Sequence, residues 1–76
     1  MEINEFVEKV AEQFDDSNPP VLEPTTVFKD LEEWSSLVAL SLIAMVDEEY
    51  EVELSGDDIR NARTVQDLFD VVSKKL

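Results

Sequence analysis

Cysteine and histidine are both missing from the sequence, and glycine occurs only once in 76 residues. Without cysteine the chain forms no disulfide, and without either residue it cannot build a Cys/His metal site or a Ser-His-Asp or Cys-His nucleophilic centre. Basic residues are scarce as well, because 6 Lys and Arg stand against 19 Asp and Glu, a net charge of −13. Such a surface repels nucleic-acid phosphates and anionic lipids, and it attracts proteins with basic patches.

Long hydrophobic runs are also lacking. The longest uncharged, mainly apolar stretch is 34–46, which is shorter than the ~20 residues needed to span a bilayer. The first five residues are acidic and do not resemble the basic start of a targeting segment. We therefore expect a cytoplasmic protein that does not insert into membranes or bind nucleic acid. The length predicts a single domain over residues 1–76, and we expect a monomer.

The first third of the chain predicts one helix and one long loop. Apolar residues recur at helical spacing from the start: Ile3, Phe6, Val7, Val10 and Phe14. The turn-forming residues at 15–18 and the pair Pro19-Pro20 end this helix. No sustained period follows up to about Trp34, and so long a loop is normally anchored or functional. The predicted anchors to the core are Val21, Leu22, Val27, Phe28 and Leu31.

A second helix is predicted to begin near Ser35 or Ser36, because either hydroxyl can cap it. One apolar stripe of this helix contains Leu37, Leu40, Ile43 and Ala44, while Val38, Leu42 and Met45 lie off it. The helix is therefore apolar over a wide arc. Such a helix either is the central helix of a bundle or presents an apolar patch to a partner.

The remainder predicts an extended connection and two more helices. Residues 50–54 alternate apolar and polar, but no second strand exists to pair with them, so we expect Tyr50, Val52 and Leu54 to turn inward from an extended segment. Ser55 with Asp58, and Thr64 with Asp67, have capping-box spacing. They predict helices at about 57–61 and 65–75. The fold class is all-α: a small four-helix bundle of three longer helices and one short, with a long loop between the first two.

Charge is distributed unevenly along the chain. Residues 1–34 contain 10 acids and 2 bases, a net charge of −8, and residues 35–54 contain 5 acids and no base. Residues 55–76 contain 4 of each and are neutral. The acidity therefore belongs to the first helix, the loop and the end of the second helix.

The most informative motif is Trp34-Ser35-Ser36-Leu37, where the long loop meets the second helix. On local features alone it is typical of a helix cap beside a packed Trp. The chain as a whole, however, resembles the acyl carrier protein family over about residues 3–75. In that family Asp-Ser-Leu, often preceded by Trp, opens the second helix after a Phe-x-x-Leu approach. The corresponding stretches here are 28–31 and 34–37, and Thr64-Val65 matches the opening of the family's last helix.

This resemblance implies a passive carrier and not an enzyme. Ser36 matches the serine to which a phosphopantetheinyl transferase attaches 4′-phosphopantetheine, a covalent cofactor taken from coenzyme A. The thiol of that arm holds an acyl group as a thioester. Leu37 and Leu40 lie on or next to the Ser36 face of the helix, as the family's partner-binding residues do. Asp47 and Glu48, about three turns further on, can pair with Arg or Lys of the partners, namely acyl-loading and acyl-transfer enzymes with basic patches. For Leu40 core packing is an equal alternative, and for Asp47 and Glu48 a solvated helix end.

The sequence departs from the family at two positions. Ser35 stands where the family has an Asp that takes part in transferase recognition, and Ser41 stands where many members have an acid on the partner-facing side. These differences favour a carrier of a specialised fatty acid or polyketide type of pathway. The alternatives are a carrier-like acidic interaction module without phosphopantetheine, and an acidic inhibitor or nucleic-acid mimic. The neutral C-terminal third argues against the mimic.

Overall fold

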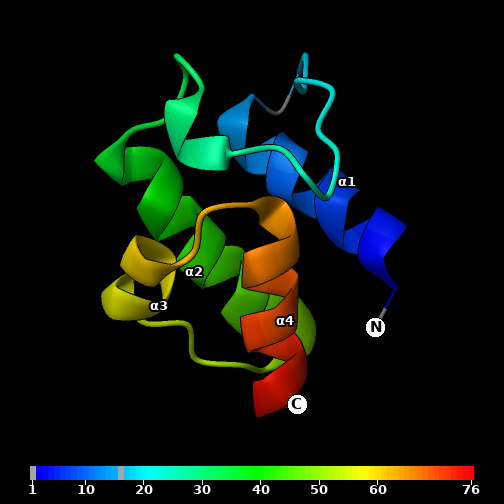
Figure 1. The fold of residues 1–76 in the computed structure, drawn as a ribbon, viewed down its shortest axis with the longest axis vertical. Coiled ribbons are helices and arrows are strands. Elements are labelled where there is room, and N and C mark those ends of the chain that lie inside the picture. Colours follow the sequence, from blue (N-terminus) through cyan, green and yellow to red (C-terminus); the bar gives the residue numbers. More distant parts are fainter. Residues whose placement is uncertain (1, 16) are drawn as a thin grey trace.

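A computed structural model describes residues 2–15 and 17–76, which form a bundle of helices (Figure 1). The helices are α1 Ile3–Phe14, the 3₁₀-helix η1 Phe28–Asp30, α2 Ser36–Tyr50, α3 Gly56–Asn61 and α4 Val65–Lys75. The predicted three longer helices and one short helix are therefore confirmed. The described residues contain no strand, apart from one isolated antiparallel bridge between Val27 and Thr64.

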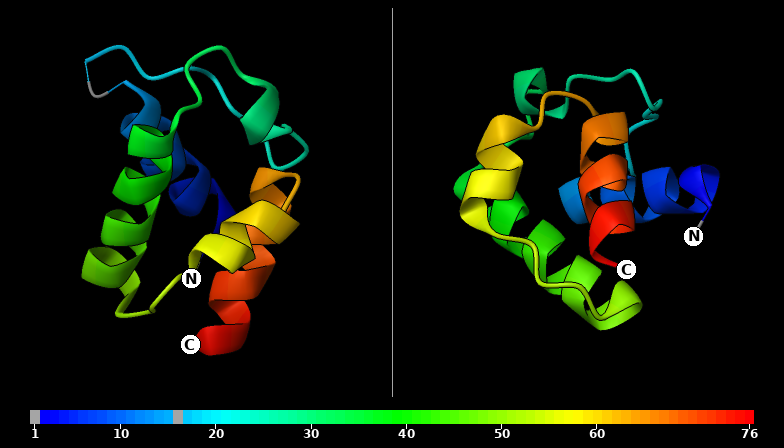
Figure 2. Two further views of the ribbon diagram at one scale, coloured as in Figure 1. Left: turned by 90° about the vertical axis from the view of Figure 1, so that its left-hand side faces the viewer. Right: turned by 60° about the horizontal axis from the view of Figure 1, so that its bottom comes forward.

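The core is built on buried side chains from α1, α2 and α4, and the two views of Figure 2 show how these helices are arranged. The apolar face predicted for α1 supplies Phe6 and Val10, which are almost completely buried. Phe6 packs edge-on against Phe69 of α4, with ring centroids 5.6 Å apart, and contacts Tyr50 at the end of α2. Burying a side chain of this size contributes roughly 2–3 kcal/mol, so these contacts determine how the three helices pack.

Helix α2 turns a different face to the core from the stripe read first in the sequence. Its buried side chains are Val38, Leu42, Met45 and Val46. Leu37 and Leu40 are instead 73% and 63% exposed. The wide apolar arc predicted either a central helix of the bundle or a helix that presents an apolar patch. Helix α2 has both properties, because one face is buried in the core and another exposes apolar side chains to solvent.

The long loop between α1 and α2 runs over one end of the bundle (Figure 2, left). Leu22 and Phe28 are buried and Leu31 is half-buried, as predicted for anchors. The prediction for Val21 is wrong, because its side chain is 94% exposed. Pro19-Pro20 restrict the backbone just before it, and the chain turns Leu22 inward, so its neighbour Val21 points outward. Asp16, part of the predicted turn, lies outside the described residues.

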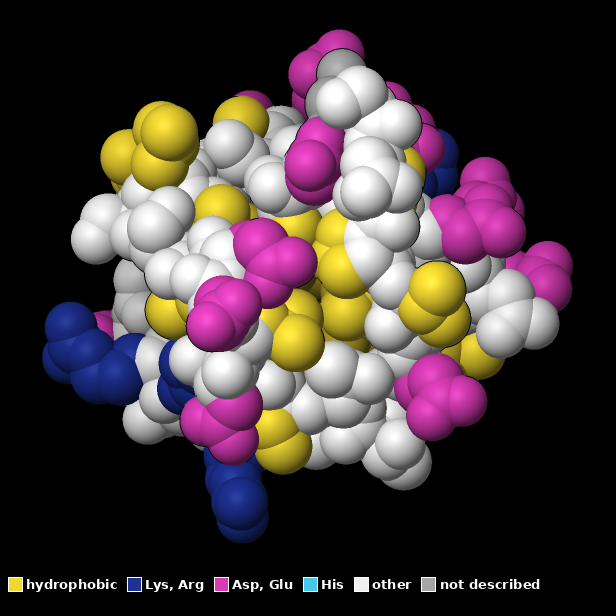
Figure 3. All heavy atoms as spheres, turned by 90° about the horizontal axis from the view of Figure 1, so that it is seen from above, with side chains coloured by type: hydrophobic (Ala, Val, Ile, Leu, Met, Phe, Trp, Pro, Cys, Tyr) yellow, Lys and Arg dark blue, Asp and Glu magenta, His cyan; other side chains and the backbone are white. Residues whose placement is uncertain are grey.

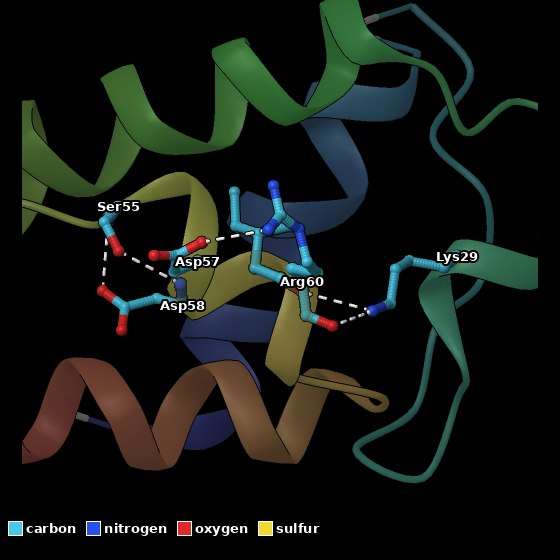
Figure 4. A network of polar contacts seen from close by, with 6 residues as sticks. Lys29, Ser55, Asp57, Asp58 and Arg60 are labelled. Atoms are coloured by element: carbon cyan, nitrogen blue, oxygen red, sulfur yellow. Dashed lines mark hydrogen bonds and ion pairs between the residues drawn. The ribbon is translucent and has the colours of Figure 1, made fainter.

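Polar contacts connect the loop to the C-terminal helices. The backbone N–H groups of Val65 and Gln66 donate to the carbonyl oxygens of Thr26 and Pro24, at 3.1 and 2.9 Å. Lys29 extends from η1 to the end of α3 (Figure 4). Its Nζ donates to the carbonyl oxygens of Ile59 and Arg60, at 3.2 and 2.7 Å. A lysine ammonium at a helix C-terminus also compensates the negative end of the helix dipole.

Both predicted capping boxes are present. The hydroxyls of Ser55 and Thr64 accept from the backbone N–H groups of Asp58 and Asp67, and both carboxylates accept in return from the capping residues' N–H groups. Val52 and Leu54 of the connection before α3 are buried, as expected. The extended segment begins later than predicted, because Tyr50, which is half-buried, is the last residue of α2 and Glu51 is in the left-handed region. None of the helices in the described part of the chain is long and apolar enough to cross a bilayer.

Candidate functional site

The start of α2 combines a well-packed base with exposed hydroxyls. Trp34 packs edge-on against the buried Phe28 at 5.1 Å between ring centroids, and against Phe14 of α1 at 6.0 Å. The loop therefore ends on a fixed aromatic cluster. Directly after it, Ser35 has an extended backbone and Ser36 is the first residue of the helix. Both serines are exposed.

The two hydroxyls differ in what they do. Ser35 is the N-cap, and its Oγ accepts from the backbone N–H of Val38 at 3.3 Å. Ser36 makes no side-chain hydrogen bond to another described residue, so its hydroxyl faces solvent without a structural role. The sequence left open which serine caps the helix. The geometry assigns the cap to Ser35 and leaves Ser36 available for modification.

The electrostatics around Ser36 suit an attached phosphodiester. The first turn of α2 contains no acidic residue. The N–H groups of that turn that the Ser35 cap does not engage, together with the positive end of the helix dipole, stabilise a negative group placed there. A serine hydroxyl is a weak nucleophile unless a base activates it, and the chain contains no histidine. The residues at this site therefore fit a serine that is modified and does not itself catalyse a reaction.

An apolar patch adjoins Ser36 along α2. We define the α2 patch as Leu37 and Leu40, whose exposure excludes the core-packing alternative for Leu40. Asp47 and Glu48 are exposed near the other end of the helix, and neither forms an ion pair with a basic side chain in the described ranges. Eleven residues of helix separate Ser36 from Asp47, or about 16 Å. The predicted partner-binding residues thus occupy one helix but are not one cluster.

A hollow of about 320 Å³ lies between α2 and α1, and its lining includes Ser41 and Glu48. On its α1 side, Lys9 Nζ contacts Glu49 Oε1 at 2.7 Å. This hydrogen bond raises the pKa of Lys9. Ser41 is half-buried here, and its side chain is neutral.

Two features of the surface were missed by the sequence reasoning. One is the exposed Val21 beside a second hollow along α1. The other is the Lys29 contact with α3, which joins residues 30 positions apart. The signal for the first was Pro19-Pro20, a stiff pair that can hold an apolar neighbour outward. No local signal predicts the second.

Comparisons with known proteins identify the family. A family model described as the phosphopantetheine attachment site matches residues 4–72. Among solved structures, the chain is similar to a holo acyl carrier protein from Geobacter metallireducens, determined by NMR in solution. The sequence identity is 27%, the TM-score is 0.76, and the match covers 96% of this chain and 83% of that one. No curated protein matches the sequence significantly.

Proposed function

Because the chain belongs to the phosphopantetheine-attachment family, we propose that Ser36 is the residue that receives its 4′-phosphopantetheine arm. Membership makes the chain a carrier and not an enzyme, with a covalent phosphopantetheine cofactor. The observation that carries the choice of residue is the division of roles at the start of α2. Ser35 is engaged as the N-cap, whereas Ser36 is exposed and free of side-chain hydrogen bonds to described residues.

The remaining parts of the proposal concern partners. A phosphopantetheinyl transferase forms a phosphodiester between the Ser36 oxygen and the phosphate of the arm. The pyrophosphate bond of coenzyme A breaks, adenosine 3′,5′-bisphosphate leaves, and the Ser36 hydroxyl proton is lost. The thiol of the arm supplies the sulfur that holds an acyl group as a thioester. We propose that transferases and acyl-transfer enzymes contact the α2 patch with apolar side chains and meet Asp47 and Glu48 with Arg or Lys. The neutral Ser41 and Ser35 favour a carrier of a specialised fatty acid or polyketide type of pathway.

The experiment is modification in vitro, read by intact mass. The protein is incubated with coenzyme A and a broad-specificity transferase, beside Ser36→Ala and Ser35→Ala variants. We expect wild type and Ser35→Ala to gain one phosphopantetheine group and Ser36→Ala to gain none. Because Ser35→Ala removes only the cap, it should lower stability by about 1 kcal/mol without moving the site. Modification that persists in Ser36→Ala would place the site elsewhere.

The Ser35→Asp variant tests the main departure from the family. Asp is as good an N-cap as Ser, so the helix start is preserved while the carboxylate common in the family is restored. We expect faster modification than in wild type, with an unchanged melting temperature. If neither wild type nor Ser35→Asp is modified by any transferase tested, the second candidate is favoured. That candidate is a carrier-like interaction module without an arm, and Ser35 is the observation in its favour.

A further inference from the structure

A second exposed apolar site lies away from the start of α2. Val21 is 94% exposed, and beside it a groove of about 440 Å³ runs between α1 and the loop. We call this the α1–loop groove, and its apolar lining comes from Val7, Ala11, Pro19, Pro20, Val21 and Leu22. In Figure 1, α1 and this part of the loop lie on the right, and α2 begins on the left. The groove is therefore separate from Ser36 and the α2 patch.

The groove has the physical character of a preformed binding surface. Val7, Ala11 and Leu22 are at most 9% exposed, so the floor belongs to the core and is fixed. Two consecutive prolines restrict the backbone of the wall that bears Val21. A rigid wall loses little conformational entropy when a partner binds. Val21 contributes little to the stability of the protein without a partner, because its side chain remains exposed to water.

The charge around the groove specifies the partner. Glu8 and Glu12 line it from α1, and none of the described residues that line it is Lys or Arg. The nearest base along α1, Lys9, is paired with Glu49 on the side facing α2. Figure 3 shows the loop end of the molecule, where hydrophobic side chains lie in a hollow among Asp and Glu side chains, and most of the visible Lys and Arg lie at the left and lower left. The ligand complementary to this surface combines apolar and basic side chains.

We propose that the α1–loop groove docks an amphipathic segment of a partner protein, with apolar residues against Val21 and its neighbours and Lys or Arg against Glu8 and Glu12. A partner held there leaves Ser36 and the α2 patch uncovered. The groove thus allows one protein to retain the carrier while another acts at the start of α2. The proposal does not depend on modification of Ser36.

The test uses the full chain with Ser36→Ala, labelled with ¹⁵N, and three synthetic helical peptides observed by NMR titration. The first has one Leu face and one Lys face. The second keeps Leu but replaces Lys by Glu, and the third keeps Lys but replaces Leu by Ser. We expect the Leu/Lys peptide to shift the amide signals of Val7, Ala11, Val21 and Leu22, and the other two to bind much more weakly.

Two matched variants locate the contact. Val21→Ser and Leu37→Ser each remove one exposed apolar side chain without changing the charge. Val21→Ser should weaken the Leu/Lys peptide about tenfold, as expected for losing one buried valine, and Leu37→Ser should not. The proposal is overturned if only Leu37→Ser weakens binding, or if the Lys/Ser peptide binds equally well. It is also overturned if Val21→Ser abolishes a concentration-dependent shift seen without peptide, because a second copy would then occupy the groove.

Discussion

At the scale of single residues, Glu51 is the position where the backbone is least suited to its side chain. It caps the end of α2 in the left-handed region, with φ 56° and ψ 37°, and its N–H donates to the Asp47 carbonyl oxygen at 3.0 Å. Glycine is favoured at such a position because it has no Cβ to clash. Glu51→Gly should therefore raise the free energy of unfolding by about 0.5–1 kcal/mol, measured by urea denaturation. Glu51→Gln controls for the lost charge, and an equal gain in both variants would contradict the backbone explanation.

The Tyr50 hydroxyl is a polar group that lies against the hydrophobic core. Its hydroxyl is buried and accepts or donates no hydrogen bond among the described residues. Burial raises the pKa of Tyr50, so the neutral form is the one the fold accepts. Tyr50→Phe keeps the ring contact with Phe6 and removes the hydroxyl, and it should stabilise the fold by about 1 kcal/mol. Tyr50→Leu, which loses that ring contact as well, should destabilise it. A less stable Tyr50→Phe protein in urea denaturation would show that the hydroxyl is satisfied.

At the scale of secondary-structure elements, the capping boxes show how far local sequence determines the fold. The Thr64 hydroxyl receives the Asp67 N–H at 3.1 Å, and this contact is confined to four consecutive residues. Thr64→Ala should cost about 1 kcal/mol of stability at neutral pH. Thr64→Ser keeps the hydroxyl and is the control. Equal melting temperatures for the Ala and Ser variants would show that the cap contributes nothing.

The capping box of α4 also makes the stability of the protein depend on pH. The N–H groups of Arg63 and Thr64 donate to the Asp67 carboxylate, and these hydrogen bonds hold the pKa of Asp67 below its ordinary value of 3.8. A lowered pKa stabilises the folded state fully above the ordinary value of 3.8, and that contribution is lost as the pH falls from 3.8 through the lower pKa of the folded state. Wild type should therefore exceed Asp67→Asn in stability at pH 7, with the difference shrinking towards pH 3. A difference that stays constant between pH 7 and pH 3 would contradict this assignment.

Asp47 lies in the last turn of α2, where an acidic side chain lowers helix stability. The last turn of α2 contains no basic residue, so its acids face the negative end of the helix dipole. Asp47→Lys should stabilise the protein by about 0.5 kcal/mol more than Glu53→Lys, which makes the same charge change outside a helix. If Asp47 binds partners, only Asp47→Lys should slow modification by the transferase, by about fivefold. Equal rates for the two variants would show that Asp47 belongs to a solvated helix end.

The elements also show where sequence reasoning reaches its limit. The helices of this chain were predictable because their caps and apolar periods are local. The inward face of α2 was not, since Leu37 and Leu42 are equally apolar and only packing against α1 and the rest of the core decides which of them is buried. The exposure of Val21 was missed for a related reason, because it depends on the backbone direction that Pro19-Pro20 impose on the residues after them. The choice between Ser35 and Ser36 likewise required the backbone geometry that makes one of them the cap.

At the scale of the whole molecule, the charge of −13 opposes the compact state. Three ion pairs are seen among the described residues, of which Arg60 with Asp57 is largely exposed, and such pairs contribute at most about 1 kcal/mol each. Salt screens both the attraction within these ion pairs and the repulsion among the remaining acids. The repulsion is the larger of the two effects, because the net charge is −13. Raising NaCl from about 10 to 200 mM, which shortens the Debye length from ~30 to below 10 Å, should raise the melting temperature by several degrees. A stabilisation of 1 kcal/mol corresponds to about 4–8 °C in a chain of this size.

A charge-reduced variant separates this repulsion from other effects of salt. Glu32, Glu33 and Glu53 are exposed, lie outside the α-helices and form no ion pair with described residues, so replacing all three by Gln removes charge and no side-chain contact. The triple variant should melt higher than wild type at low salt and respond less to added NaCl, so that the two melting temperatures converge. Parallel salt curves would mean that salt acts by general exclusion and not by screening. Convergence would instead mean that the acidity of this carrier is maintained at a cost in stability, as expected if its charge serves the attraction of basic partners.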